Sequence, residues 1–556
     1  MVTSEKKLFY YLLITLTACF MVILIVRYVM IMFPHKEAAY HESLAISRVQ
    51  RGTIYDRNGT ILAYEAPYYS CAVLLKDVGS LDDTIIHLSR ILDSTVSEIQ
   101  EALAGKSTYA MIKKHLSDAE YTTLREAVRS GDLPGVTIEK RYGRIYPQGS
   151  HGAHVIGFTD IDNVGLTGIE YSFDTLLSPL HDPSKEITQG NDIYLTIDHR
   201  IQFDVDNRCR ELTEEHHPDS AVILVMDAKT GELLAYTSYP RFDLNDYNLS
   251  TAEERLNRPI SMMYEPGSVF KIFSLASILD IGDANTDKLF LCDGSYTFTM
   301  DNGKSATINC LKPHGEVGPK EILKYSCNGG ISYYALQTDS NKFYKHICDF
   351  GFNQKTAIDL PGEISGMLQT PANWSGRSKP TISFGQEIGV TALQMTTAAT
   401  VFTHDGYLLK PRIVRAIYDP GTKKLTYTEP STVRKVISKK TAHDILTMMV
   451  SVTEPGGTAI HAKHTGVTVS AKTGTAQILD LDTNTYSADH VLASSIAILP
   501  TEDPQYIIYV AADNPTGGEY YGSAVAAPTI EKITEDLISL GLLDSSSSDI
   551  RYVSTE

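Results

Sequence analysis

An apolar run near the N-terminus constrains this chain more than any other feature of its sequence. Residues 8–26 are apolar apart from Thr15 and Thr17. A helix of this length can cross a hydrocarbon core of about 30 Å. Lys6 and Lys7 precede the run, and positive residues remain on the cytoplasmic side of such a helix. We therefore predict a cytoplasmic N-terminus over residues 1–7, a single-pass inner-membrane anchor over residues 8–33 and an extracytoplasmic (periplasmic) chain beyond it.

The segment Leu16-Thr17-Ala18-Cys19 offers an alternative, because it resembles a lipoprotein cleavage box in which Cys19 would carry a lipid. The apolar run continues from Phe20 to Val26, whereas a processed lipoprotein turns polar after its cysteine. The pattern favours an uncleaved anchor and leaves lipidation of Cys19 open.

Length and composition exclude several classes of protein. A chain of 556 residues is too long for one hydrophobic core and predicts two or three domains. Hydrophobic residues make up 43% and charged residues 21%, which is typical of a globular protein and excludes general disorder. The formal net charge is -18 and no long Lys/Arg run occurs, so we predict no nucleic-acid partner.

Two folded regions follow the predicted anchor. Residues 34–200 carry apolar residues at helical spacing over 84–92, 96–103 and 120–128, and an alternating strand pattern over 191–198. We predict a domain that mixes helices and strands there.

Residues 201–540 form the larger region. Strand patterns lie at both of its ends, over 221–226, 233–236, 467–471, 494–499 and 506–512, while 525–540 has a helical pattern. Mostly helical sequence separates the two groups of strands. Strands contributed from both ends predict an antiparallel sheet flanked by helices, which is an α+β fold. Residues 541–556 are predicted to be a polar tail.

Ser268 and Lys271 are the first candidate catalytic residues. Pro266 and Gly267 precede them, and an apolar helix that ends at Gly282 follows. Residues three apart lie on one face of a helix, so the Lys271 amine can reach the Ser268 hydroxyl. A serine becomes a useful nucleophile only when a base takes its proton, and a buried lysine can act as that base. Alone, the pattern is weak, because an N-cap serine with a solvated lysine gives the same sequence.

Two more motifs follow in the same region. Ser326-Cys327-Asn328 offers a hydroxyl that can pass a proton and an amide that can hold Lys271 or a substrate amide. Lys472-Thr473-Gly474-Thr475 follows the strand over 467–471. Lys472 and the two threonines can bind a carboxylate, and Gly474 would let a ligand backbone approach closely. Each motif alone could be an ordinary turn or strand end.

The three motifs in this order resemble the set found in β-lactamases and penicillin-binding proteins. Further segments resemble class B penicillin-binding proteins, and they cover most of the chain beyond the anchor. These segments are Arg51–Gly59, Tyr146-Pro147, His154, Gly157-Phe158, Gly168-Ile169-Glu170, Gly385-Gln386, residues 391–394 and Gly457-Thr458-Ala459. No Glu-x-x-x-Asn arrangement lies between Asn328 and Lys472, which disfavours a hydrolytic β-lactamase.

The resemblance implies that residues 34–200 are an elongated, non-catalytic pedestal domain of the class B dimerisation type and that residues 201–540 are the penicillin-binding (transpeptidase) domain. It implies a serine D,D-transpeptidase that cross-links peptidoglycan and needs no cofactor. Ser268 would attack the D-Ala–D-Ala bond of a stem peptide, with Lys271 as base and Ser326 and Lys472 as the proton relay. Asn328, Thr473, Gly474 and Thr475 would bind the substrate, and β-lactams would acylate Ser268. The backbone N–H groups of Ser268 and Thr475 could form an oxyanion hole.

The context of the first two motifs resembles septal members of the family, which act in cell division beside a membrane-embedded glycan polymerase of the SEDS family. An elongation-type transpeptidase is the alternative. A non-enzymatic β-lactam sensor or division scaffold is a hypothesis from another class. A sensor usually has several membrane spans, whereas this sequence predicts one. A scaffold should have lost a motif residue, whereas all three motifs are present here.

The seven cysteines suggest one disulfide and no metal site. Cys292 and Cys310 flank a predicted hairpin over 295–309, and an extracytoplasmic location permits them to pair. Two reduced, buried thiols are the alternative. No C-x-x-C pair occurs, so we predict no structural zinc site, and we interpret His216-His217 as a surface loop.

Overall fold

A computed structural model describes residues 15–25, 27, 48–300, 302–480 and 485–545. Residues 15–25, within the predicted anchor, are helical. None of the helices in these ranges is both long and apolar enough to span a membrane. Residues 1–14, 26 and 28–47, and the tail from 546, lie outside the described residues, so the anchor stays a prediction.

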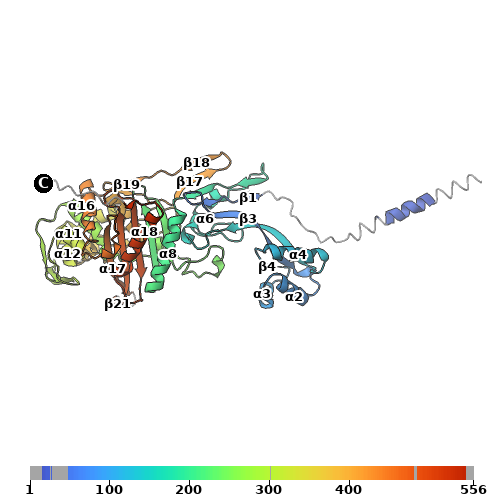
Figure 1. The fold of residues 1–556 in the computed structure, drawn as a ribbon, viewed down its shortest axis with the longest axis horizontal. Coiled ribbons are helices and arrows are strands. Elements are labelled where there is room, and N and C mark those ends of the chain that lie inside the picture. The colour runs from blue at the N-terminus through green and yellow to red at the C-terminus, as the bar shows by residue number, and fades with distance from the viewer. Residues whose placement is uncertain (1–14, 26, 28–47, 301, 481–484, 546–556) are drawn as a thin grey trace, which may run out of the picture. The chain divides into compact units, whose positions relative to one another are not determined.

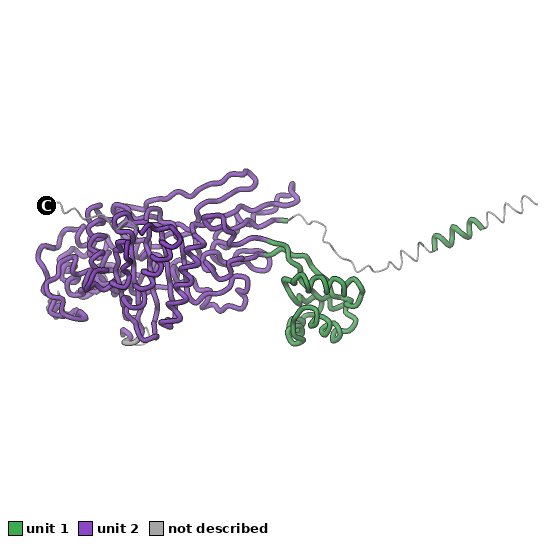
Figure 2. The backbone as a smooth tube through the Cα atoms, in the orientation of Figure 1, with its two compact units in different colours: residues 1–48, 66–143 green, residues 49–65, 144–556 purple. Residues whose placement is uncertain are grey.

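Contacts divide the chain into two compact units, drawn in two colours in Figure 2. One comprises residues 1–48 and 66–143, and the other comprises residues 49–65 and 144–556. By this division, residues 144–200 pack with the larger region. The boundaries predicted from the sequence at residues 34, 200 and 540 stay predictions.

The smaller unit is a mixed α/β fold, and its helices confirm the predicted ones. Helices α2 (Leu81–Ile91), α3 (Val96–Leu103) and α4 (Asp118–Ser130) accompany strand β4 (Tyr109–Lys113), which pairs with the second half of β3 (Ile61–Leu74). Thr95 and Ser117 begin α3 and α4 with capping boxes, which satisfy otherwise unpaired backbone N–H groups.

Within the larger unit, residues before position 200 share a sheet with residues after position 400. Strand β2 (Ile54–Tyr55) pairs with the first half of β3 and lies parallel to β7 (Asp192–Leu195). Strand β17 (Val414–Asp419) pairs with β7, and β18 (Lys424–Tyr427) pairs with β17. The predicted strand over 191–198 is therefore confirmed and receives its neighbour from a distant part of the sequence.

A buried ion cluster holds this part together. Glu170 is fully buried, and its two carboxylate oxygens accept hydrogen bonds from Arg51 Nε at 2.7 Å and Arg144 Nε at 2.5 Å. Arg51 also donates to Asp174 at 2.6 Å, and Arg144 donates to the Gly52 carbonyl at 2.7 Å. Arg51 and Glu170 belong to the segments that carried the family resemblance, and the structure gives them a structural role.

The centre of the larger unit is a five-stranded antiparallel sheet with the order β20-β21-β22-β8-β9. Its strands are β8 (Ser220–Asp227), β9 (Leu233–Tyr239), β20 (Ser470–Asp480), β21 (Thr485–Leu499) and β22 (Tyr506–Asp513). The antiparallel sheet built from both ends of the region is confirmed. One detail of the prediction is wrong: β20 begins at Ser470 and runs through Lys472–Thr475, so the third motif lies inside a strand and not after it.

Helices cover this sheet (Figure 1). Helix α8 (His199–His216) packs with α18 (Ala527–Ser539) on β8, β9, β21 and β22, whereas α15 (Ala392–Thr403) packs with α16 (Lys439–Val450) on β8, β20 and β22. Almost every residue of β8 is buried, as expected for a strand covered on both faces. The helix predicted over 525–540 is confirmed from Ala527 onward, after the short helix α17 (Gly522–Val525).

The remaining elements of the larger unit are short. Its other helices are α5 (Ala153–Ile156), α6 (Gly168–Ser172), α7 (Asp174–Leu177), α9 (Arg258–Ser261), α13 (Ser340–Asp349) and α14 (Ser378–Ser383). The predicted hairpin is formed by β11 (Ser295–Thr299) and β12 (Ser305–Asn309), and it lies between β10 (Phe290–Cys292) and β13 (Gly315–Val317), which pair with each other. The others are β6 (Ile187–Gln189), β14 (Met367–Leu368), β15 (Ile388–Gly389), β16 (Tyr407–Leu409) and β19 (Thr432–Lys435). Strand β5 (Val136–Ile145), most of which belongs to the smaller unit, pairs with β3.

The buried ion cluster predicts a large effect of removing its acid. Glu170→Ala leaves the buried guanidinium group of Arg144 without its carboxylate and leaves Arg51 only that of Asp174, and we expect it to lower the free energy of unfolding by about 3–5 kcal/mol. The matched control is Glu186→Ala, at an exposed position, which should change stability by less than about 0.5 kcal/mol. Denaturant unfolding of both variants checks this, and equal stability of the two would contradict it.

Candidate functional site

The predicted nucleophile lies where a tight turn becomes a helix. Ser268 sits in the 3₁₀ turn Gly267–Phe270, directly before helix α10 (Lys271–Ile281), and Gly282 ends that helix in a left-handed conformation, as predicted. Gly267 has φ +54°, and its N–H donates to the Gly385 carbonyl at 2.9 Å. A side chain at either glycine would be strained there, since both have positive φ. These glycines fix the turn that presents Ser268.

The Lys271 amine is the centre of the site. It is fully buried, and its Nζ lies 2.7 Å from Ser268 Oγ. It is also 2.8 Å from the Ser326 carbonyl oxygen, 2.7 Å from Asn328 Oδ1 and 3.0 Å from Ser326 Oγ. A neutral amine has two N–H donors and one lone pair. If the carbonyl and the amide oxygen take the two donors, the lone pair remains for the Ser268 hydroxyl.

The second motif lies between two helices. Ser326 ends helix α11 (Pro319–Tyr325) in a left-handed conformation with φ +57°, and Cys327 caps helix α12 (Asn328–Leu336). This sharp reversal turns both the carbonyl and the hydroxyl of Ser326 toward Lys271. Asn328 donates from its Nδ2 to the Asn309 carbonyl at 3.0 Å, which orients its Oδ1 toward Lys271.

The third motif reaches the same place from strand β20. Lys472 is fully buried, and its Nζ lies 3.2 Å from Ser326 Oγ, so the Ser326 hydroxyl lies between the two lysine amines. The structure therefore brings Ser268, Lys271, Ser326, Asn328 and Lys472 together.

The remaining residues of this motif contact other segments. The Thr473 hydroxyl donates to the Thr458 hydroxyl at 2.8 Å, and Thr475 Oγ1 accepts from the Gly522 N–H at 3.1 Å. A Cβ at Gly474 would lie 2.8 Å from Val269 and 3.1 Å from the Pro266 carbonyl oxygen. Gly474 thus lets β20 approach the turn that carries Ser268, a role other than the ligand approach that the sequence suggested.

Burial shifts the pKa values of both lysines in the direction that base catalysis needs. Desolvation lowers the pKa of Lys271 to about 8, although the nearby thiols of Cys327 and Cys310 oppose this shift. Desolvation, followed by the charge of Lys271, holds the pKa of Lys472 well below its usual value. A neutral lysine amine next to a serine hydroxyl can take its proton as the serine attacks a carbonyl. The Ser326 hydroxyl can relay that proton, because it contacts both amines.

The predicted Cys292–Cys310 disulfide is not present in the structure. The two Sγ atoms lie 3.7 Å apart as free thiols, whereas a disulfide needs about 2.05 Å. The side chains of Cys327 and His314 lie beside these two thiols, and the ligand atoms of all four residues are within 4.8 Å of one another. The group contains no C-x-x-C pair, because its members come from separate elements. The spacing Cys310-x-x-x-His314 was the one signal in the sequence that could have pointed to it.

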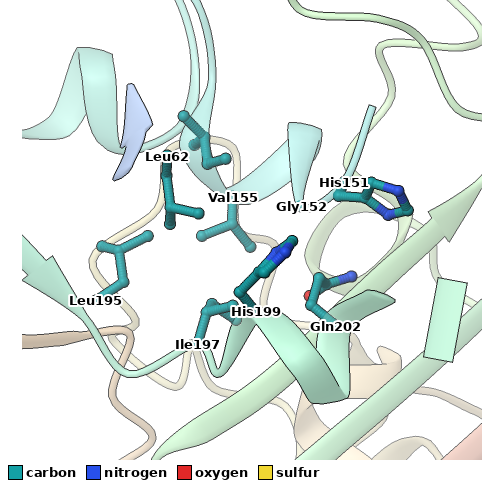
Figure 3. Close-up of a pocket in the computed structure, with 9 residues that line it drawn as sticks. Leu62, His151, Gly152, Val155, Leu195, Ile197, His199 and Gln202 are labelled. Carbon is teal, nitrogen blue, oxygen red and sulfur yellow. The ribbon is translucent and has the colours of Figure 1, made fainter. Parts of the chain in front are cut away.

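A small cavity elsewhere in the larger unit contains none of the motif residues (Figure 3). Leu62, Val155, Leu195 and Ile197 form its apolar side, and His151, His199 and Gln202 also line it. Its volume of about 10 Å³ is enough for roughly one water molecule, which excludes a substrate site.

Comparisons with known proteins agree with this geometry. The family described as "Penicillin binding protein transpeptidase domain" matches residues 221–535, and the one described as "Penicillin-binding Protein dimerisation domain" matches residues 46–189. The chain is 31% identical to the "Probable peptidoglycan D,D-transpeptidase PenA" of Neisseria gonorrhoeae, over 87% of this chain and 83% of that protein. It is also 31% identical to the "Stage V sporulation protein D" of Bacillus subtilis, over 88% of this chain and 78% of that protein.

A solved structure has the same fold. The crystal structure of penicillin binding protein 3 from Mycobacterium tuberculosis, complexed with aztreonam, superimposes with a TM-score of 0.71 at 25% sequence identity, over 89% of this chain and 97% of that one. A transpeptidase domain and a dimerisation domain occur together in this chain, as in class B members. The chain therefore belongs to the class B penicillin-binding proteins, and the resemblance found in the sequence is confirmed.

The pKa of Lys271 predicts how acylation depends on pH. Only the neutral amine can accept the Ser268 proton, so the second-order rate of acylation by a fluorescent penicillin should rise roughly tenfold from pH 7 and level off above about pH 8.5. Stopped-flow labelling of the full chain checks this. A rate independent of pH between 6 and 9 would contradict the assignment of Lys271 as the base.

Proposed function

We propose that this chain is a peptidoglycan D,D-transpeptidase that cross-links stem peptides through an acyl-enzyme on Ser268. One observation carries the proposal: the buried Lys271 amine lies 2.7 Å from the Ser268 hydroxyl and is held by Ser326 and Asn328. The names of the relatives agree with this reaction, because the Neisseria protein is named as a probable peptidoglycan D,D-transpeptidase.

The reaction follows from these contacts. Ser268 Oγ attacks the carbonyl carbon of the D-Ala–D-Ala bond while its proton passes to Lys271. The tetrahedral intermediate collapses, the C–N bond breaks, and the leaving D-Ala amine receives a proton through Ser326 Oγ, which contacts both Lys271 and Lys472. An amine from a neighbouring stem then attacks the ester and releases Ser268. A β-lactam would follow the first half of this path and remain attached.

Strand β20 is proposed to hold the donor peptide. It is the last strand in the order of the five-stranded sheet, so its outer edge is available to an extended peptide. We assign Thr473 and Thr475 to the terminal carboxylate of the donor and Asn328 to one of its amides. The backbone N–H groups of Ser268 and Thr475 would bind the developing oxyanion.

We further propose that the enzyme is anchored by residues 8–33 with its N-terminus in the cytoplasm, and that it acts at the septum with a glycan polymerase of the SEDS family and other division proteins. The apolar run and the motif context of Ser268 support this proposal. A role in sporulation is the second candidate, because the similarity to the Bacillus subtilis sporulation protein is equally high.

The activity is tested with variants at Lys271. Lys271→Ala removes the base and should slow both D-Ala release from a synthetic pentapeptide and β-lactam acylation by about 10²–10⁴-fold. Lys271→Arg should not restore the rate, since a guanidinium keeps its proton. Lys440→Ala, at an exposed position, is the matched control and should react normally. Full activity with Arg at position 271 would refute Lys271 as the base.

The cellular role is tested by depletion. Loss of a septal transpeptidase should give filaments with blocked septa during growth. Round or swollen cells would assign the enzyme to elongation, and normal growth with defective spores would assign it to sporulation. Both outcomes would refute the septal role while leaving the activity in place.

A further inference from the structure

Four metal-binding side chains converge beside the catalytic centre. Cys292 at the end of β10, Cys310 after β12, His314 before β13 and Cys327 at the start of α12 each offer one ligand atom, and these four atoms all lie within 4.8 Å of one another. Cys292 and Cys327 are buried, and the other two are partly buried.

Three of the distances between these atoms match a tetrahedral zinc site, and the others are within 4.8 Å. With Zn–S near 2.3 Å and Zn–N near 2.05 Å, tetrahedral angles place neighbouring sulfurs about 3.8 Å apart and a sulfur about 3.5 Å from a nitrogen. The observed Sγ–Sγ distances are 3.7 Å for Cys292–Cys310 and 3.8 Å for Cys310–Cys327. Cys292 Sγ lies 3.4 Å from His314 Nδ1.

Backbone groups around the cluster suit thiolate ligands. The Gly329 N–H donates to Cys310 Sγ and the Gly330 N–H donates to Cys327 Sγ, each at 3.3 Å. Hydrogen bonds of this kind around the metal ligands orient them and support their negative charge. A Cβ at Gly329 would lie 3.1 Å from Phe290, and one at Gly330 would lie 2.9 Å from Ile322, so both positions are tightly packed.

We propose that Cys292, Cys310, His314 and Cys327 bind one structural Zn²⁺. Binding releases three protons, one from each thiol, and forms three Zn–S bonds and one Zn–N bond with a net charge of -1. The four ligands leave no open position, so the ion does not activate water or substrate.

The proposed ion acts on the catalytic centre through Cys327, which lies between Ser326 and Asn328. Both of these neighbours contact the Lys271 amine, and Asn328 is also bonded to Asn309, next to Cys310. Zinc would therefore fix the second motif to the β11–β12 hairpin. Cys327 is a positioning residue in this account, because it holds Ser326 and Asn328 in place.

Metal content is the direct test. The full chain, purified in detergent without a metal-chelating column, should contain about one zinc per chain, as measured by inductively coupled plasma mass spectrometry. Cys348→Ser is the matched control, because Cys348 lies outside the cluster, and it should keep the zinc. Cys292→Ser and His314→Ala should lose most of it, and His314→Cys should retain it because a thiolate replaces the imidazole.

Cobalt substitution adds a readout that does not depend on activity. Protein loaded with Co²⁺ should show the intense near-ultraviolet bands of thiolate-to-cobalt charge transfer, and these should weaken in Cys292→Ser but not in Cys348→Ser. Absence of zinc and of these bands in the wild-type chain would overturn the proposal. A Cys292–Cys310 or Cys310–Cys327 disulfide in unreduced peptides would also overturn it.

The rate of β-lactam acylation shows whether the ion positions the second motif. Of the three tests, only this one rests on the proposed function. Removing zinc with a chelator should slow β-lactam acylation about 10–100-fold, and adding zinc back should restore it. If the chelator removes the zinc and acylation continues at the same rate, the positioning role is refuted, but the zinc site itself is not. Lack of acylation in the zinc-loaded wild type would instead count against the proposed function.

Discussion

The burial of the Lys271 amine is the constraint on which the rest of the site depends. A charged ammonium in a fully buried position is costly, so the surrounding structure must either pair it or favour its neutral form. Oxygen atoms of Ser268, Ser326 and Asn328 contact the amine, and no carboxylate within the described part of the chain forms a hydrogen bond with it. These contacts keep the amine in place, and burial lowers its pKa, so that Lys271 becomes a usable base.

Three separate segments of the fold converge around that amine. The turn before α10 supplies Ser268, the junction of α11 and α12 supplies Ser326 and Asn328, and strand β20 supplies Lys472 next to Ser326. Gly474 permits β20 to lie against the turn that carries Ser268. The sheet and its helices therefore serve chiefly to bring three distant segments to one point.

The sequence predicted what local patterns and motif order determine. Apolar spacing predicted helices α2, α3 and α4 and the strands of the central sheet, and the three motifs predicted the residues around Lys271. It could not predict that β17, from residue 414 onward, pairs with β7, because that pairing depends on tertiary contacts. It also missed the group of Cys292, Cys310, His314 and Cys327, whose ligands become neighbours only when a hairpin folds against α12.

Ser268 is the proposed nucleophile of this site. Its most direct test is the position of the covalent bond after the full chain has reacted with a penicillin, measured by peptide mass spectrometry. We expect one acyl group per chain, on the peptide that contains Ser268, and none in Ser268→Ala. An acyl group on Ser326, or undiminished labelling of Ser268→Ala, would contradict it.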